Sequence, residues 1–271
     1  MAQDSAALKV AVTPTLDCLP LFVAEAAGLF GQGGADVRLR HYSAHMDCDT
    51  AVARGTVEGT FTDLVRAERL RQQDVPLYYA TSTQLSFQLL SSRTARIKQL
   101  KQLDDKMLAM TRYSATALLA DHAVDSARLK SERVFRIQVN DVNLRLNMLE
   151  NNIMDALVLP EPQATQARNV MAHVMIDTRD LGWQMGALAF REEVKDNPER
   201  QRQIDQLLKI YNQACDSLNE HGLEYYRDLI VNQCKVKPST VDSLPKNIRF
   251  QHAAAPKASD IERAKNWLKK Q

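Results

Sequence analysis

The sequence predicts an α/β protein of two lobes with a helical C-terminal region. Up to Thr81, short β-type runs alternate with helical segments, which is typical of parallel βα units. The same alternation begins again after Arg93, and from Asn197 onward the pattern is purely helical. Two consecutive α/β units favour two lobes over one continuous sheet.

The first unit opens with an apolar, β-branched strand at residues 8–12, which Thr13-Pro14-Thr15 ends. A helical pattern follows at residues 19–30, where Pro20 is tolerated in the first turn. The remaining expected elements of this unit are strands at 37–42, 59–61 and 77–81, and helices at 47–54 and 63–72.

The second unit repeats this order. We expect strands at 106–110, 134–139, 156–159 and 174–176, and helices at 114–123, 142–150 and 162–169. In the C-terminal region, residues 198–220 carry the apolar stripe of an amphipathic helix. A second helix is expected at 223–233, entered through Gly222. Ser259 and an acidic first turn predict a last helix that ends at Trp267-Leu268.

The composition is that of a soluble globular protein. Hydrophobic residues make up 45% and charged residues 25% of the chain, and the net charge is +2. Lys and Arg mostly lie close to acidic residues, so no concentrated basic face is expected and nucleic acid is an improbable partner. No run of 18 apolar residues suggests a membrane span. We expect no cofactor.

The opening residues 1–7 (MAQDSAA) lack the basic start and apolar middle of a leader. A cytosolic protein has such an opening, and so does an exported protein whose leader has been removed. Composition does not separate these two alternatives.

The four cysteines are scattered, without CxxC or CxxH spacing, which argues against a structural zinc site. A Cys18–Cys48 disulfide, a thiol contact to a ligand and a metal pair with His45 are alternatives for the first two cysteines. A Cys215–Cys234 bridge is conceivable between successive helices. His41, His45 and Cys48 have only loose metal-like spacing, so we expect no metal.

Several segments, in this order and spacing, carry a family resemblance. They are VAVTPT at 10–15, LPLFVA at 19–24, GLF at 28–30, GTFTD at 59–63, TRYSAT at 111–116, DALVLPEP at 155–162 and the helical region from 198 to 268. Together they resemble the periplasmic solute-binding proteins of the sulfonate, nitrate and thiamine-precursor group, the NMT1/SsuA-like family. The resemblance covers nearly the whole chain, although each motif is short.

The resemblance implies a type II periplasmic-binding-protein fold with a double-strand hinge. The chain would cross between lobes near residues 91–93 and 182–188. Residues 1–91 plus 183–271 would form lobe 1, and residues 92–182 lobe 2.

The resemblance also implies a function, that of the solute-binding protein of an ABC importer. Such a protein captures a small polar molecule by hinge closure and delivers it to a permease. A periplasmic location, a monomeric state and a lipid-bearing cysteine upstream of Met1 belong to this expectation. The ligand would be anionic or zwitterionic, sulfonate- or thiamine-precursor-like. The acids and cysteines at 15–18 and 46–49 match no particular ligand class. The identity of the ligand is therefore not inferred from the family.

Ligand-binding candidates follow from the rule that ligands lie beyond the carboxyl ends of the strands in α/β sheets. The strongest group comprises Arg112, Tyr113, Ser114 and Thr116, after the strand at 106–110. A guanidinium, hydroxyls and free backbone N–H groups at a helix start suit an anion. The alternative is that Ser114 only caps its helix and Arg112 lies in solvent.

In the first lobe, Asp17, Asp47 and Asp63 each follow a predicted strand. Their carboxylates would accept hydrogen bonds from amine-type donors of the ligand, and the alternative for each is helix N-capping. The other candidates are Thr15, Thr62, Thr81 and Gln84 as neutral partners, Tyr42 as a stacking ring, and Asn140 and Glu161 after second-lobe strands.

The main alternative is an enzyme on the same fold, of the thiamine-pyrimidine or menaquinone biosynthesis type. The pyrimidine-forming relatives carry a cysteine cluster that this chain lacks. The six histidines show no partner spacing for acid–base work, and there is no GxSxG signature. A transcription regulator of this fold would begin with a helix-turn-helix, whereas this chain begins with a strand. We therefore predict a binding protein and not an enzyme.

Overall fold

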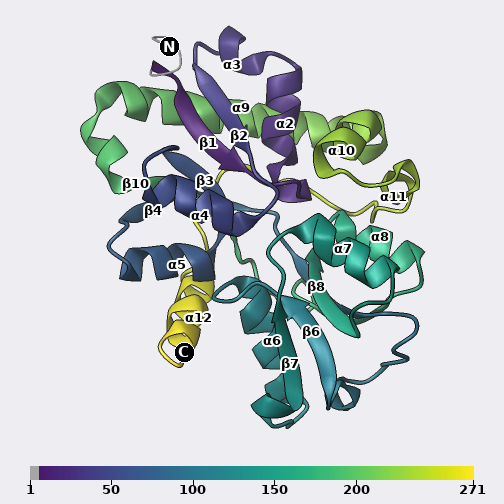
Figure 1. Ribbon diagram of the computed structural model, residues 1–271. Helices are drawn as coiled ribbons and strands as arrows, with labels where there is room; N and C mark the ends of the chain where they lie inside the picture. The colour runs from purple at the N-terminus through teal and green to yellow at the C-terminus, as the bar shows by residue number, and fades with distance from the viewer. Residues whose placement is uncertain (1–5) are drawn as a thin grey trace.

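The computed structural model describes residues 6–271 as two five-stranded mixed sheets flanked by helices (Figure 1). Residues 1–5, most of the opening that lacks leader features, lie outside the described residues. The first sheet has the strand order β2-β1-β3-β10-β4 and the second has the order β7-β6-β8-β5-β9. The predicted α/β architecture with two lobes is confirmed.

The first lobe keeps the predicted order of strands and helices. Its strands are β1 (Leu8–Val12), β2 (Val37–His41), β3 (Gly59–Asp63), β4 (Leu77–Thr83) and β10 (Gly186–Arg191), and its helices are α2 (Leu19–Ala26), α3 (Leu29–Gln32), α4 (His45–Ala53) and α5 (Leu64–Gln72). The helix expected at 19–30 is split because Gly28 adopts the left-handed region, with φ of 65°, between α2 and α3.

The second lobe repeats this arrangement. Its strands are β5 (Phe87–Ser91), β6 (Lys106–Met110), β7 (Val134–Gln138), β8 (Ala156–Pro160) and β9 (His173–Asp177), and its helices are α6 (Ala115–Ser126), α7 (Val142–Glu150) and α8 (Gln163–Asn169). In each sheet, one strand that enters from the other lobe runs antiparallel to its neighbours. That strand is β10 in the first sheet and β5 in the second.

The chain crosses between the sheets twice, at residues 84–86 and at residues 178–185. The first crossing comes before the predicted position near residue 91, because β5 pairs with β8 and β9. All five β5 residues are buried, including the polar Gln88 and Ser91, so the strand shows no alternation of buried and exposed positions. The predicted lobe boundary at residue 91 therefore falls at the end of β5.

The C-terminal region is helical, as predicted. It contains α9 (Pro198–His221), α10 (Arg227–Cys234), α11 (Pro238–Asp242) and α12 (Ala258–Leu268), and the short 3-10 helices along the chain are Leu16–Cys18, Leu100–Leu103, Ser131–Arg133, Glu192–Asp196 and Leu223–Tyr226. Helix α9 packs on α2, whereas α12 packs on α5 and α6 and so contacts both lobes (Figure 1). None of the helices formed by residues 6–271 is long and apolar enough to cross a membrane.

Candidate ligand-binding site between the lobes

The loops after the strands of the two sheets face each other in three places. The backbone N–H of Leu16, after β1, donates to the carbonyl of Glu161, after β8, at 2.8 Å. Ala44, after β2, forms a β-bridge with Asp141, after β7. The carboxylate of Asp63, at the end of β3, accepts from the backbone N–H of Ala115, after β6, at 3.0 Å. The carboxyl ends of both sheets thus meet at one interface, where α/β proteins bind their ligands.

Asp17 is the buried acid at the hinge end of this interface. Its Oδ1 accepts from the Thr15 hydroxyl at 2.6 Å, and its Oδ2 accepts from the Thr83 hydroxyl at 3.1 Å. Burial raises the pKa of Asp17, and the two hydroxyl groups oppose that shift. The crossing segment at residues 84–86 therefore begins beside a carboxylate of the first lobe.

Asp63 caps α5 and also reaches the second lobe. Its Oδ1 accepts from Arg66 N at 3.1 Å within the first turn of α5, as well as from Ala115 N. Burial raises the pKa of Asp63 to about 6, although Arg66 and the two backbone donors lower it. Asp63 therefore caps α5, which is the alternative given for it from the sequence. The same carboxylate also joins the two lobes. Thr62 beside it is buried, and its hydroxyl donates to the Asp63 carbonyl at 3.3 Å.

The buried hydroxyl groups of the predicted anion loop after β6 form hydrogen bonds within the loop itself. The Ser114 hydroxyl caps α6 by accepting from Thr116 N at 3.1 Å and donates to the Thr111 carbonyl at 2.7 Å. The Thr116 hydroxyl accepts from Thr111 N at 2.9 Å. Both hydroxyl groups are buried and shape the loop that presents Ala115 N to Asp63.

Five charged or titratable residues from both lobes form a set that we call the arginine cluster: His45, Asp49, Asp63, Arg66 and Arg145. His45 and Asp49 lie four residues apart on one face of α4. Arg66 Nη2 lies 2.7 Å from Asp49 Oδ2, and the Arg66 side chain is only 2% exposed. Arg145, on α7 of the second lobe, is 1% exposed, and its Nε and Nη1 have no hydrogen-bond partner among residues 6–271.

The charges of this cluster influence one another. Burial lowers the pKa of His45 well below its usual value, and the charges of Arg66 and Arg145 lower it further. His45 is therefore neutral at pH 7, with Nε2 lying 3.4 Å from the Thr13 hydroxyl. Burial and the charge of Arg66 lower the pKa of Arg145 to about 10, so its guanidinium stays cationic at pH 7.

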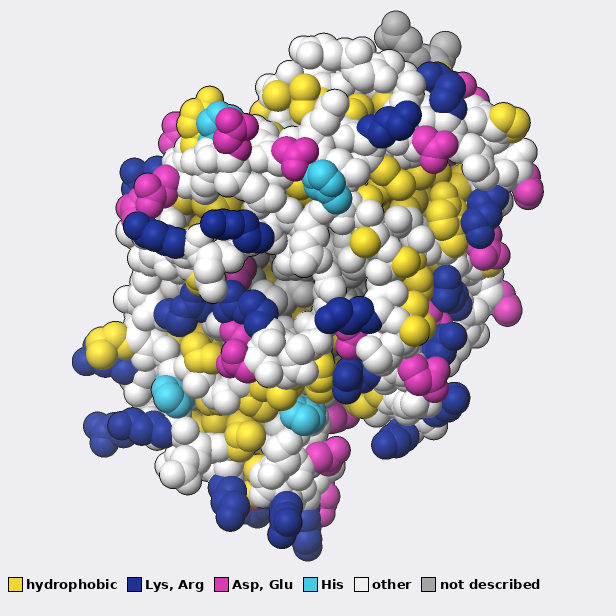
Figure 2. Space-filling model, turned by 180° about the vertical axis from the view of Figure 1, so that it is seen from behind, with side chains coloured by type: hydrophobic (Ala, Val, Ile, Leu, Met, Phe, Trp, Pro, Cys, Tyr) yellow, Lys and Arg dark blue, Asp and Glu magenta, His cyan; other side chains and the backbone are white. Residues whose placement is uncertain are grey.

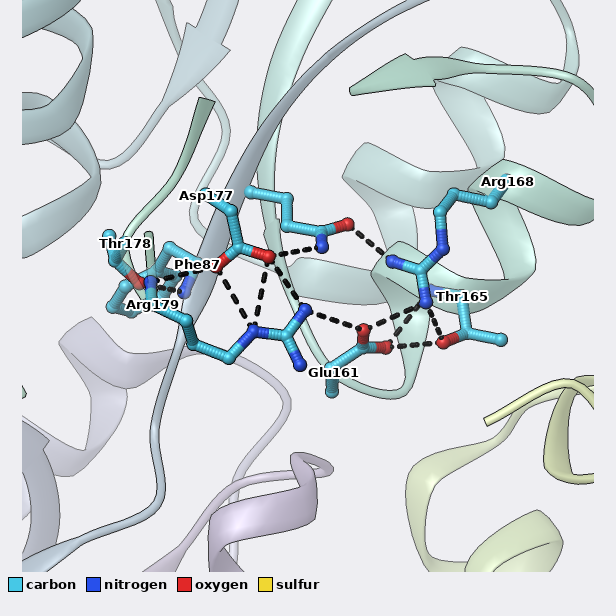
Figure 3. Close-up of polar contacts among 8 residues, drawn as sticks. Phe87, Glu161, Thr165, Arg168, Asp177, Thr178 and Arg179 are labelled. Carbon is cyan, nitrogen blue, oxygen red and sulfur yellow. Dashed lines mark hydrogen bonds and ion pairs between the residues drawn. The ribbon is translucent and has the colours of Figure 1, made fainter. Parts of the chain in front are cut away.

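A second polar region lies at the hinge, and we call it the hinge pocket. It is a cavity of about 180 Å³ lined from both crossings, with Gln84, Glu161, Arg179, Gln184 and Arg249 among its polar side chains. Figure 3 shows the network beside it. Arg168 Nη2 lies 3.0 Å from Glu161 Oε1, and Arg179 Nη2 lies 2.6 Å from Asp177 Oδ2. The acids and bases of this network are paired with one another.

The structure brings most of the predicted site residues to the interface. Thr15, Asp17, Thr62, Asp63, Ser114, Thr116 and Glu161 are buried there, Gln84 lines the hinge pocket, and Asn140 follows β7. Glu161 also accepts from Thr165 N at 3.0 Å, so it caps α8 from within the interface. Their ligand-binding role stays a prediction.

Five predicted residues lie at the edge of the interface or elsewhere. Tyr42 packs against the apolar cluster of the first lobe beside Cys48, and Asp47 is exposed on α4. The Thr81 hydroxyl bonds the backbone of Ala254 in the C-terminal segment. Arg112 is exposed in a groove on the outer side of the second lobe, and the ring of Tyr113 stacks under the guanidinium of Arg69 at 3.8 Å. Tyr113 thereby contacts α5 of the first lobe, whereas the other four side chains are exposed or contact other segments.

Arg66, Arg145 and Gln163 are buried polar residues that the sequence did not predict. Each belongs to a helix that carries several polar side chains, where a solvent-facing position is the usual expectation. The one available signal was that Arg66 follows the capping Asp63 by one turn. All four cysteines are buried with free thiols, so neither conceivable disulfide is present.

Two α/β lobes joined by two crossings, with their strand ends facing each other, define the type II periplasmic-binding-protein fold. The sequence matches the family described as "NMT1/THI5 like" over residues 15–244, most of the chain, and the protein belongs to that family. A search of curated proteins finds no match.

Solved structures share this fold at low sequence identity. The alkanesulfonate-binding protein SsuA from Xanthomonas axonopodis pv. citri has a TM-score of 0.83 and 14% identity, over 97% of this chain and 91% of that one. The periplasmic nitrate-binding protein NrtA from Synechocystis has a TM-score of 0.75 and 13% identity, over 91% and 73%. The Candida albicans CA3427 gene product has a TM-score of 0.74 and 14% identity, over 97% and 89%. These comparisons confirm the predicted family and fold.

Proposed function

We propose that this protein is the solute-binding component of an ABC importer and captures a small polar molecule between its lobes. One observation carries the proposal, namely that the loops after β1, β2 and β3 face the loops after β8, β7 and β6 and bury polar side chains between them. Two of the similar solved structures are described as binding proteins, for alkanesulfonate and for nitrate. Both descriptions favour a binder over the enzyme alternative.

The mechanism is hinge closure. Rotation at residues 84–86 and 178–185 moves the lobes apart without breaking either sheet, because both crossings lie between strands. A ligand that contacts both lobes at once stabilises the closed form. Closure removes the ligand's polar groups from water, so each of them requires a partner in the protein. The buried hydroxyl, carboxylate and guanidinium groups of the interface supply such partners.

The remaining features of the function belong to the same proposal. The partner is the permease of the importer, the location is the periplasm, and a lipid attaches the protein to the membrane. We expect a monomer. Both basic and acidic side chains are spread over the face seen in Figure 2, with several Lys and Arg side chains gathered across its middle, and the net charge of the chain is +2. We expect no binding to nucleic acid.

Native mass spectrometry of freshly purified protein tests the proposal. We expect a small-molecule adduct that is lost on mild denaturation. Small-angle scattering should give a smaller radius of gyration when the identified molecule is returned to the stripped protein. A stripped protein with the same radius of gyration before and after the return of the molecule would argue against hinge closure. The absence of any adduct, together with no thermal stabilisation by polar metabolites, would contradict the binding function.

A further inference from the structure

We infer that the free edge of β7 binds an extended polypeptide segment that carries a carboxylate, which adds to the second sheet as a further strand. A groove of about 610 Å³ lies beside this edge, lined by residues 134–137 of β7, by residues of α6 and by the end of α12, and we call it the edge groove. The inference goes beyond solute capture, because the ligand is part of another protein. In the proposed function, the permease would supply the segment.

Strand β7 lies at the edge of the second sheet and pairs with β6 alone (Figure 1). Both backbone groups of a residue in a parallel ladder point to the same side, and successive residues alternate between the two sides. Val139 N donates to the Met110 carbonyl of β6 at 2.9 Å, so every second residue counted back from Val139 faces β6. The N–H and C=O groups of Arg136 and Gln138 therefore point to the free edge.

These outward groups are available for pairing. Val134, at the start of the edge, is satisfied, because its N–H donates within the preceding 3-10 turn and its carbonyl accepts from Arg136 Nη1 at 3.1 Å. The outward N–H and C=O groups of Arg136 and Gln138 have no partner in the part of the chain that the structure describes. In the first sheet, by contrast, the edge of β4 is covered, since Ser82 N donates to the Ala254 carbonyl at 2.7 Å. The edge of β7 can therefore pair with an added strand.

Aromatic rings flank this edge on both faces of the sheet. On the α6 face, the edge groove is lined by Tyr113, which is 37% exposed, and by Trp267 of α12. Val134 packs in the apolar cluster beneath α6, so its neighbour Phe135 points to the opposite face, where it is 49% exposed. The side chains of an added strand alternate between these faces, so apolar residues of the segment would meet a ring on either side.

The charges of the edge groove favour an acidic segment. Asp121 is engaged, because its Oδ1 accepts from Arg136 Nη2 at 2.7 Å and its Oδ2 accepts from Trp267 Nε1 at 3.0 Å. Arg112, at the Gln138 end of the groove, is exposed and forms no ion pair with any of residues 6–271. A guanidinium offers paired N–H donors that match a carboxylate. We therefore expect an acidic residue where the bound segment passes Arg112.

Synthetic peptides test the inference by fluorescence anisotropy. The parent probe is a fluorescein-labelled peptide with alternating valine and threonine between two terminal glutamates, and a matched peptide carries glutamine in place of both glutamates. We expect the glutamine peptide to bind about tenfold more weakly, the effect of losing a charge-assisted bond. In R112Q the two peptides should bind equally, whereas the exposed control R93Q should keep the difference.

Two further peptides test strand addition itself. Each is the parent peptide with N-methyl groups on one of the two alternate sets of amides. Because alternate amides of a strand point to opposite sides, one N-methyl peptide should lose binding and the other should bind as the parent does. Hydrogen-exchange NMR should show that the parent peptide protects the amides of Arg136 and Gln138. The amide of Ile137 already faces β6 and should not change, which makes it the internal control.

Each other outcome overturns the inference. Equal binding of both N-methyl peptides, or binding without protection of Arg136 and Gln138, would exclude strand addition. Equal affinities of the glutamate and glutamine peptides for the wild type would exclude a carboxylate at Arg112. Protection of the two edge amides in the free protein that rises with protein concentration would assign the edge to a second copy of the chain. No binding of the parent peptide would exclude the edge groove as a docking site, and a solute adduct in native mass spectrometry would still support solute capture.

Discussion

The carboxylate of Asp63 and the backbone N–H of Ala115 join the two lobes through a hydrogen bond of 3.0 Å. The same carboxylate oxygen caps α5 through Arg66 N. One side chain thus stabilises a helix start in the first lobe and docks the start of α6 from the second lobe against it. This dual role ties the closed arrangement to the local structure of α5.

Replacing Asp63 with Ala should destabilise the protein and weaken closure together. Loss of an N-cap costs about 1 kcal/mol, and the N–H of Ala115 loses its partner as well. We expect urea unfolding to show a loss of about 1–2 kcal/mol for D63A. The variant D63N is the matched control, because its amide oxygen still accepts from both N–H groups, and it should lose less. Equal losses in D63A and D63N would show that the charge, and not the acceptor, matters.

Arg145 should hold the unliganded protein open. In the open form its guanidinium is solvated, whereas closure without a ligand buries Nε and Nη1 without partners. The variant R145M removes this penalty, so its ligand-free form should have a smaller radius of gyration in small-angle scattering than ligand-free wild type. The control R145K should stay open, because a buried ammonium carries the same penalty. An R145M variant as open as the wild type would contradict this account.

His45 should make stability depend on pH. Its pKa in the folded protein lies well below 6.5, so below pH 6.5 the unfolded chain binds a proton that the folded protein does not. Stability contributed by neutral His45 is therefore present above pH 6.5 and is lost as the pH falls, by up to about 1.4 kcal/mol per pH unit.

The comparison with H45Q isolates this contribution. Asp63, with its pKa raised to about 6, acts in the opposite direction, since the folded form binds a proton more readily than the unfolded form between pH 6 and 3.8. This effect is common to both proteins and cancels in their difference. Between pH 7.5 and 5.5, urea unfolding should show a larger loss for the wild type than for H45Q. Parallel pH profiles would mean that His45 is protonated in the folded state.

Arg112 provides a test of the site boundary. Sequence reasoning places it in the anion loop after β6, but its side chain is exposed on the outer side of the second lobe. We expect R112Q to bind the solute identified by native mass spectrometry within twofold of the wild type by calorimetry. A tenfold loss in R112Q would return the site to the loop that the sequence indicated.

The fold could be predicted because each βα unit carries local signals. The strand Leu8–Val12 and the first-turn position of Pro20 in α2 could be predicted from the properties of a few neighbouring residues. The antiparallel strands β5 and β10 escaped notice because they are short, buried on both faces and follow a crossing instead of a helix. Their pairing depends on residues far away in the sequence.

The site could be predicted only in part, for a related reason. Asp63 ends a strand, Ser114 follows one, and both cap helices, so their positions and local roles can be predicted from the sequence. Arg145 lies in a helix whose sequence pattern does not indicate that this side of the helix contacts the other lobe. Its burial arises from the β-bridge between Ala44 and Asp141. These two residues are 97 positions apart in the sequence. Contacts between residues so far apart cannot be predicted from the residues that neighbour Arg145 in the sequence.

Helix α12 should couple the lobes through its buried end. Ala264 and Leu268 belong to one apolar cluster with Leu64 of the first lobe and Leu119 of the second, and Trp267 Nε1 donates to Asp121 Oδ2 of α6 at 3.0 Å. A buried Leu→Ala change costs about 2–5 kcal/mol, and we expect L268A to lie near the lower end because the helix end can relax. The exposed neighbour change K269A should alter stability by less than about 0.5 kcal/mol.

Both tryptophans report on this region, since Trp183 belongs to the same cluster and Trp267 packs against it. In the wild type, tryptophan fluorescence and far-ultraviolet circular dichroism should therefore show one coincident urea transition. In L268A the fluorescence transition should shift to lower urea concentration and precede the loss of secondary structure, because the contact between the lobes is weakened first. Coincident transitions in L268A, with a stability equal to that of K269A, would mean that α12 does not couple the lobes.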